Sequence, residues 1–164
     1  MSVLPLRKPN ASHSRAPTMA AGERLLVGAL MVWAAARRGR QTPNRAVADV
    51  LAQRAGPRVA ALFVAWIQSV EAACLRPMET ECPGCGGVGL DLQRLVVACG
   101  LAPVDMEVGE QLLAPLVSDP TGVMTLARGL NAAMAQAGWP LPVRLYAPAE
   151  PCGAQAAAHD QTFH

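Results

Sequence analysis

Two cysteines, Cys82 and Cys85, are the residues of this chain whose type and spacing are best suited to chemistry. They lie in the stretch ETECPGCGGVGLD, which runs from Glu79 to Asp91 and contains four glycines. Two thiolates at this spacing can bind one metal ion or form a disulfide, and glycines permit the tight turn that a metal site requires. Three hypotheses therefore stay open: a metal site, an inert corner or incidental disulfide, and a redox pair.

The sequence CPGCGGVG fits the pattern C-x-x-C-x-G-x-G, with Cys82, Cys85, Gly87 and Gly89 at the fixed positions. It resembles one zinc-binding unit of the DnaJ-type co-chaperones. That family uses several such units, two for each zinc ion, whereas this chain has one. The resemblance covers eight residues and implies the chemistry of a zinc knuckle, but not chaperone activity.

A weaker resemblance extends over three short segments, GERLLVGAL, CPGC and GEQLLAPL. Together they are similar to small, uncharacterised all-α bacterial proteins with a Cys-Pro cluster in the middle of the chain. This resemblance implies no activity.

A single C-x-x-C pair supplies two of the four ligands that zinc prefers. We expect Cys74 as the third ligand, because residues 75–81 can form a loop that returns to Cys82. Cys99 lies about 12 Å along a helix from Asp91, at 1.5 Å per residue, and reaches the site only if that helix folds back; its alternative role is a small buried side chain. Two chains of a homodimer could instead each donate Cys82 and Cys85.

The chemistry of an enzyme is not apparent in the sequence. The three histidines, His13, His159 and His164, lie in segments that we expect to be disordered, so none is a rigid general base. A thioredoxin-like pair needs its first cysteine at a helix N-terminus, but here the glycines delay the helix to about Asp91. The function predicted is a non-enzymatic interaction or regulatory module with an unknown protein partner, and the alternative is a thiol redox or metal-handling protein.

Charge is distributed unevenly along the chain and raises a third functional hypothesis. Residues 1–58 carry ten basic and two acidic residues, a net charge of +8, whereas the remainder carries four basic and ten acidic residues, a net charge of −6. Such a basic segment is compatible with nonspecific binding of nucleic-acid phosphates, which we do not favour. The residues that would carry it are Arg37, Arg38, Arg40 and Arg45.

The composition, which is 52% hydrophobic and 4% aromatic, predicts an all-α fold. Ala and Leu favour helices, and small side chains let helices pack closely. We expect a disordered leader (1–20), a compact bundle of five to six helices with a Cys/Gly-rich central loop (21–146) and a disordered tail (147–164). The expected helices are Gly22–Arg38, Pro43 to Gly56 with Thr42 as N-cap, Arg58–Leu75 at the centre of the bundle, Asp91–Cys99, Asp105–Val117, and Pro120 to Gly138. After the last helix, WPLPVRLYAPAEP should be extended, as a strand or an arm packed on the bundle.

The longest uncharged apolar runs, Leu25–Ala36 and Val59–Val70, are shorter than the roughly 18–20 residues of a membrane-spanning helix. The N-terminal residues lack the apolar centre of a signal peptide, and translation could begin at Met1 or at Met19. We therefore expect a cytoplasmic protein with reduced thiols.

Overall fold

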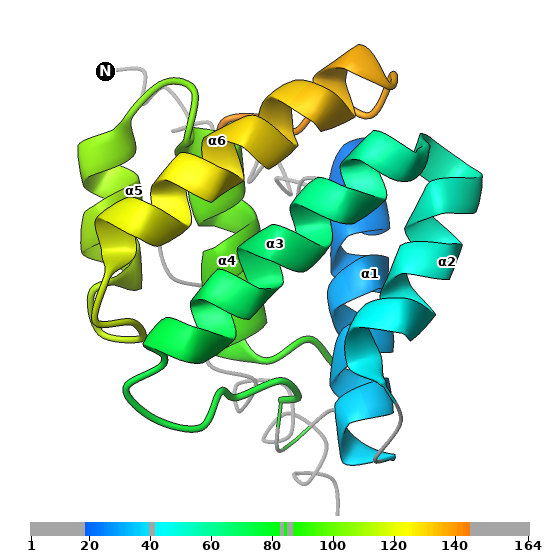
Figure 1. Ribbon diagram of the computed structural model, residues 1–164. Coiled ribbons are helices and arrows are strands. Elements are labelled where there is room, and N and C mark those ends of the chain that lie inside the picture. The colour runs from blue at the N-terminus through cyan, green and yellow to red at the C-terminus, as the bar shows by residue number, and fades with distance from the viewer. Residues whose placement is uncertain (1–18, 40–41, 83, 85–86, 145–164) are drawn as a thin grey trace, which may run out of the picture.

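The computed structural model describes residues 19–39, 42–82, 84 and 87–144, and these residues form an all-α bundle (Figure 1). The expected all-α fold is thus confirmed. The helices of the described residues are α1 (Ala21–Arg38), α2 (Pro43–Ala55), α3 (Pro57–Ala73), α4 (Leu90–Leu101), α5 (Met106–Leu113) and α6 (Pro120–Gln136). Cys85, Arg40 and most of the expected leader and tail lie outside the described residues.

The helices form two groups of three, joined through α3 and α6 and through α1 and α4 (Figure 1). In the first group α2 packs against both α1 and α3, and in the second α4, α5 and α6 all contact one another. The loop that carries the cysteines connects α3 to α4 and therefore links the two groups.

Several helix ends lie where local sequence places them. Gly56 has a φ of 93°, a conformation that favours glycine, and it separates α2 from α3. The Asp119 side chain accepts a hydrogen bond of 2.9 Å from the Gly122 N–H, so it caps α6 as expected. Gly138, with a φ of 84°, follows the last turn of α6.

The bounds predicted for two helices were wrong. The helix expected to stop before Gly100 continues to Leu101, and Gly100 lies within it, where the C-terminal arm passes close to the helix. A Cβ at this position would lie 2.7 Å from the carbonyl oxygen of Pro142. The helix expected to reach Val117 ends at Leu113 and is followed by turns around Pro115, since proline disrupts helical hydrogen bonding.

Residues 139–144 form the arm that the sequence predicted, without strand pairing among the described residues. The arm also passes the first turn of α1, where a Cβ on Gly22 would overlap the carbonyl oxygen of Pro140. Arg144 then reaches Glu23, with 2.8 Å between Nη2 and Oε2. These contacts hold the arm against α1 and α4.

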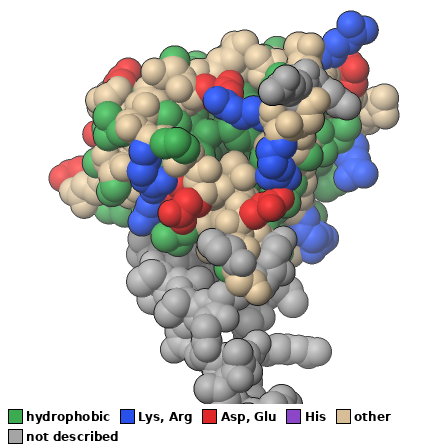
Figure 2. Space-filling view, turned by 90° about the horizontal axis from the view of Figure 1, so that it is seen from below, with side chains coloured by type: hydrophobic (Ala, Val, Ile, Leu, Met, Phe, Trp, Pro, Cys, Tyr) green, Lys and Arg blue, Asp and Glu red, His purple; other side chains and the backbone are tan. Residues whose placement is uncertain are grey.

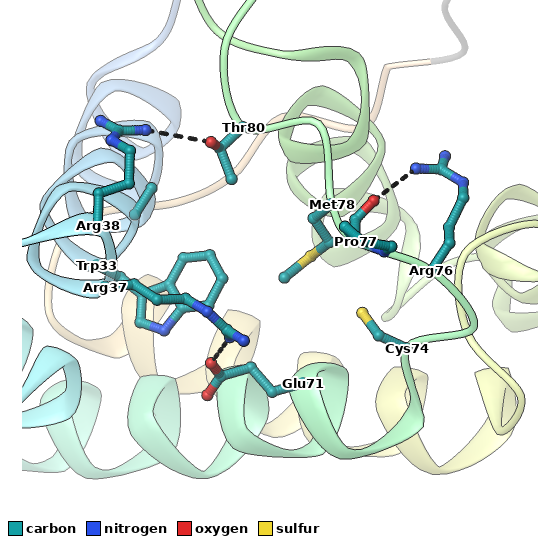
Figure 3. A pocket seen from close by; sticks show the side chains of 10 residues that line it. Trp33, Arg37, Arg38, Glu71, Cys74, Arg76, Pro77, Met78 and Thr80 are labelled. Carbon is teal, nitrogen blue, oxygen red and sulfur yellow. Dashed lines mark hydrogen bonds and ion pairs between the residues drawn. The ribbon is translucent and has the colours of Figure 1, made fainter. Parts of the chain in front are cut away.

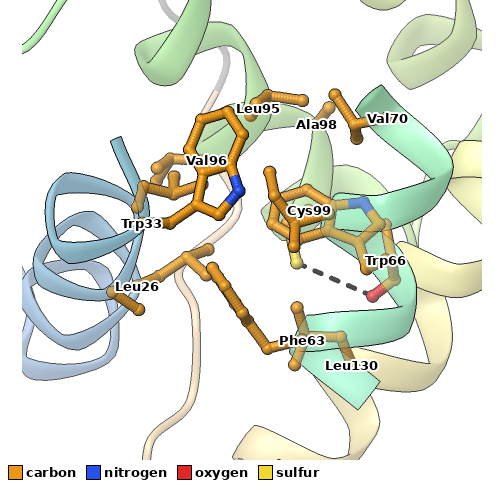
Figure 4. Close-up of a cluster of buried hydrophobic side chains, with 14 of the residues drawn as sticks. Leu26, Trp33, Phe63, Trp66, Val70, Leu95, Val96, Ala98, Cys99 and Leu130 are labelled. Atoms are coloured by element: carbon orange, nitrogen blue, oxygen red, sulfur yellow. Dashed lines mark hydrogen bonds between the residues drawn. The ribbon is translucent and has the colours of Figure 1, made fainter. Parts of the chain in front are cut away.

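The core contains aromatic side chains at its centre, although the chain has few of them. Trp33, Phe63 and Trp66 are at most 1% exposed, and the rings of Phe63 and Trp66 meet edge to face with centroids 5.9 Å apart (Figure 4). One side of α3 is buried. Its other side is exposed at Ala61, Ala65 and Gln68, because small and polar side chains there tolerate solvent.

Two prolines leave helical carbonyls without their usual partner, and tertiary contacts replace it. Pro103 has no N–H for the carbonyl of Cys99, which accepts a hydrogen bond of 2.8 Å from the buried Asn131 side chain of α6. The carbonyl of Ala73 also lacks a helical partner, because α3 ends at this residue with Pro77 following it, and it accepts the N–H of Ser118 at 2.8 Å. These bonds fix α4 on α6 and the end of α3 on the segment that follows α5.

None of the helices in the described ranges is both long enough and apolar enough to cross a membrane.

Candidate functional site

The cysteine loop is closed by a short hairpin. The N–H of Cys82 donates to the carbonyl of Gly87 at 2.8 Å, and the N–H of Gly89 donates to that of Thr80 at 3.1 Å. A Cβ on Gly89 would overlap the carbonyl oxygen of Glu79, so only glycine permits this backbone approach. Gly89 of the C-x-x-C-x-G-x-G pattern therefore has a structural role independent of any metal.

The base of the loop is held by Asp91, which is 0% exposed. Its carboxylate accepts two hydrogen bonds from Arg76, at 2.8 and 2.9 Å, one from the Glu79 N–H at 2.8 Å and one from Arg94 at 3.1 Å. Burial raises the pKa of Asp91, but the hydrogen bonds from Arg76 and Glu79 and the charges of Arg76 and Arg94 outweigh it and hold the pKa below its ordinary value. The helix expected to begin at Asp91 begins one residue earlier, at Leu90, with Gly89 as its N-cap.

The structure does not bring the described cysteines together. Cys82 lies on the hairpin, partly exposed, and Cys74 lies at the end of α3. Cys99 is buried between α4 and α6, where its thiol donates to the carbonyl of Ala127 at 3.6 Å (Figure 4) and burial raises its pKa to about 12. Cys99 thus packs as a small core side chain.

Among the described residues, no three His, Cys, Asp or Glu side chains lie close enough to hold a metal ion. A site made of Cys74, Cys82, Cys85 and Cys99 therefore lacks support from the three cysteines that are described. Cys85, the other cysteine of the C-x-x-C pair, lies outside the described residues.

Cys74 lines a pocket of about 350 Å³ between the ends of α1 and α3 and the loop 76–80 (Figure 3). Arg37 lies over the ring of Trp33, 5.6 Å from its centroid, and pairs with Glu71. Burial raises the pKa of the Cys74 thiol in this pocket, and the charge of Arg37 only partly offsets that effect. Of the other charged side chains that line the pocket, Arg38 pairs with Glu81 and Arg76 with Asp91, so the charges around the pocket are engaged by the protein itself.

Two of the arginines proposed for nucleic-acid binding form ion pairs with acidic side chains. Arg37 pairs with Glu71, and Arg38 pairs with Glu81 at 2.7 Å. Arg45 is exposed on α2. The face shown in Figure 2 accordingly presents basic and acidic side chains next to one another. Since a phosphate-binding surface needs unopposed positive charge, this arrangement does not favour nucleic acid.

A larger pocket, of about 600 Å³, is an open groove between α1 and α4, and we call it the α1–α4 groove. Most of its lining side chains are apolar. The α1 side carries Glu23 and Val27, which are four residues apart on one face of the helix, and Met19, which precedes the helix. The remaining lining residues are Val88, Leu90, Gln93, Arg94, Val96, Val97 and Leu112.

Two apolar side chains at this groove are unusually exposed for their size. Leu90 is 43% exposed and Met19 is 46% exposed. The hairpin of the cysteine loop contributes Val88, whose carbonyl accepts a hydrogen bond of 2.9 Å from Gln93 on α4. The cysteine loop and the groove are therefore parts of one continuous surface.

Comparisons with protein-family models, with curated proteins and with solved structures gave no match. The candidate site consequently rests on geometry alone. Sequence reasoning missed the groove, because its lining comes from segments some seventy residues apart. Helical spacing within each segment was visible, but the pairing of α1 with α4 was not.

Proposed function

We propose that this chain is a non-enzymatic interaction module that holds a helical segment of a partner protein in the α1–α4 groove. The observation that carries the proposal is the groove itself, an apolar hollow with Leu90 and Met19 exposed at it. Contiguous exposed apolar surface of this kind marks binding sites in soluble proteins.

The shape of the groove favours a helix as its occupant. Its two sides are helical faces, with residues spaced by four on α1 and by three or four, at 90, 93 or 94, and 97, on α4. A third helix can insert one row of side chains between two such faces, as helices do when they pack. Helix-in-groove binding uses apolar anchors at i, i+3 or i+4, and i+7.

Neither alternative function has comparable support. Arg37 and Arg38 are engaged with Glu71 and Glu81, which weakens the case for nucleic acid. The redox alternative depends on Cys85, which lies outside the described residues. The module is proposed to act in the reducing cytoplasm, as its sequence led us to expect.

We also propose that a zinc ion is shared between the cysteine loops of two chains. Because no three potential ligands come together among the described residues and Cys99 is buried against α6, we propose that two copies of the chain each supply Cys82 and Cys85 to one ion, in a homodimer. Zinc would then serve as a structural staple of the cysteine loop. This component is independent of the groove, and it has its own test in the Discussion.

The groove is tested by placing a photoreactive amino acid at Leu90, or at Val104 as control, in cells of the source organism. Val104 is 67% exposed and does not line the groove. We expect one protein to cross-link through position 90 only. That protein, once purified, should bind the wild-type chain and lose at least tenfold in affinity for Leu90→Glu.

Leu90→Glu should preserve the fold, because an acidic residue is favoured in the first turn of α4. A captured protein that binds Leu90→Glu and wild type equally would contradict the proposal. So would a small amphiphile that copurifies with wild type, as seen by native mass spectrometry, and is lost from Leu90→Glu.

A further inference from the structure

The charges around the α1–α4 groove point to a further property of its occupant, and we infer that the partner helix carries acidic side chains beside its apolar stripe. This inference rests on the proposed function, since it concerns the same groove. It follows from which charged groups at the groove are accessible and which are already engaged.

Both carboxylates at or next to the groove are buried and engaged by the protein itself. Glu23 is 6% exposed and accepts the N–H of Ala20 at 2.7 Å and the guanidinium of Arg144 at 2.8 Å. Asp91, which bonds to the lining residue Arg94, is 0% exposed and accepts four hydrogen bonds. Neither carboxylate presents its charge outward to a partner.

The basic groups at the groove are more accessible. Arg24 is exposed, and it donates to the carbonyl of Met19, a residue that lines the groove, at 2.6 Å. The side chain of Arg94 is 27% exposed and lines the opposite side. The outward-facing charge is therefore positive on both sides of an apolar floor, and an acidic partner complements it.

The groove also sets the length of the anchoring stripe. Residues 90 to 97 of α4 span about 10 Å at 1.5 Å per residue, which is two turns of helix. An occupant with apolar residues at i, i+4 and i+7 covers the same distance. The expected partner segment is thus two to three turns of amphipathic helix, with acidic residues flanking three apolar anchors.

A displayed library of random 16-residue peptides tests the inference, with selection on the wild-type chain and counter-selection on Leu90→Glu. We expect enrichment of peptides with apolar residues at helical spacing and net negative charge. Two synthetic peptides with the enriched apolar residues, flanked by Glu in one and by Lys in the other, are then compared by fluorescence anisotropy. The Glu peptide should bind at least fivefold more tightly.

Charge reversal on the protein separates this electrostatic preference from general affinity. Arg24→Glu should weaken binding of the Glu peptide about five- to tenfold and strengthen binding of the Lys peptide. Arg54→Glu, on the exposed surface of α2, changes net charge equally and should change neither affinity.

Enriched peptides with helical spacing but no acidic preference would overturn the inference and leave the proposed function standing. Failure of the selection to distinguish wild type from Leu90→Glu would overturn both. A wild-type dimer that becomes monomeric in Leu90→Glu, measured by sedimentation, would assign the groove to a second copy of the chain and also overturn the inference.

Discussion

The carboxylate of Asp91 accepts two hydrogen bonds from the guanidinium of Arg76, at 2.8 and 2.9 Å, and this pair closes the base of the cysteine loop. The two residues are fifteen positions apart, on either side of the hairpin that carries Cys82. Because Arg94 bonds the same carboxylate and also lines the α1–α4 groove, the pair fixes the loop and one side of the groove together.

Arg76→Met should destabilise the fold, because it removes two of the four hydrogen bonds to the buried carboxylate of Asp91. Loss of one partner of a fully buried ion pair costs about 3–5 kcal/mol. The cost here is smaller, because Arg76 is 39% exposed and Arg94 still bonds Asp91. Urea denaturation followed by tryptophan fluorescence measures the change. Arg54→Met on exposed α2 is the control and should stay within about 0.5 kcal/mol of wild type; an equally small effect of Arg76→Met would refute the role assigned to the pair.

The stability of the protein should fall in acid partly through Asp91. Its pKa is lowered in the folded state from an unfolded value of about 3.9, so its contribution is present above that value and is lost as pH falls through the lower, folded pKa. In Asp91→Asn, the loss of stability between pH 5 and pH 2 should be smaller than in wild type. Urea midpoints across this range test it, with Glu107→Gln, an exposed carboxyl on α5, as control. Identical pH profiles for wild type and Asp91→Asn would contradict the prediction.

Two glycine substitutions should have opposite effects. Gly89→Ala forces a Cβ against the Glu79 backbone and should cost about 1–3 kcal/mol, as overpacking does. A Cβ added to Gly28, on the exposed side of α1, would meet nothing within 4 Å, so Gly28→Ala should stabilise the helix by up to about 1 kcal/mol. Melting temperatures measured by circular dichroism distinguish the two. If the melting temperature of Gly89→Ala equalled that of Gly28→Ala, the hairpin would not require glycine at position 89.

Zinc, if two chains share it through Cys82 and Cys85, should appear in native mass spectrometry as one ion in each dimer. Apparent zinc binding contributes about 10–16 kcal/mol in small folded sites, so a strong chelator should dissociate the dimer and loosen the loop. Cys82→Ser should be a metal-free monomer, whereas Cys99→Ala, in the core, should retain zinc at reduced stability. A metal-free wild-type monomer with unchanged melting in chelator would end the zinc hypothesis.

Much of the fold could be predicted from local signals. Helical spacing of apolar residues, Asp119 before Pro120, and the Gly56-Pro57 pair each depend on a few neighbouring residues, and each marks a helix end in the structure. Both errors in helix bounds concern residues that usually end helices. Gly100 was expected to stop a helix, yet it lies inside α4, where its missing side chain leaves room for the distant Pro142, and this contact was not visible in the local sequence.

The candidate site was harder to predict for the same reason. The cysteine pattern was evident in the sequence. In the structure, however, Cys99 packs against α6 in the core, and the carboxylate of Asp91 bonds to Arg76. The α1–α4 groove depends on how two helices from different halves of the chain come together. No spacing within either helix specifies that contact.

Titration of the acidic peptide into the isotope-labelled protein, followed residue by residue by NMR, tests the groove most directly. We expect chemical-shift changes to concentrate on residues 19–28 of α1 and 88–97 of α4, and to disappear in Leu90→Glu. Changes that concentrate instead around Trp33, Glu71 and Cys74, or that spread evenly over the surface, would contradict the proposed site.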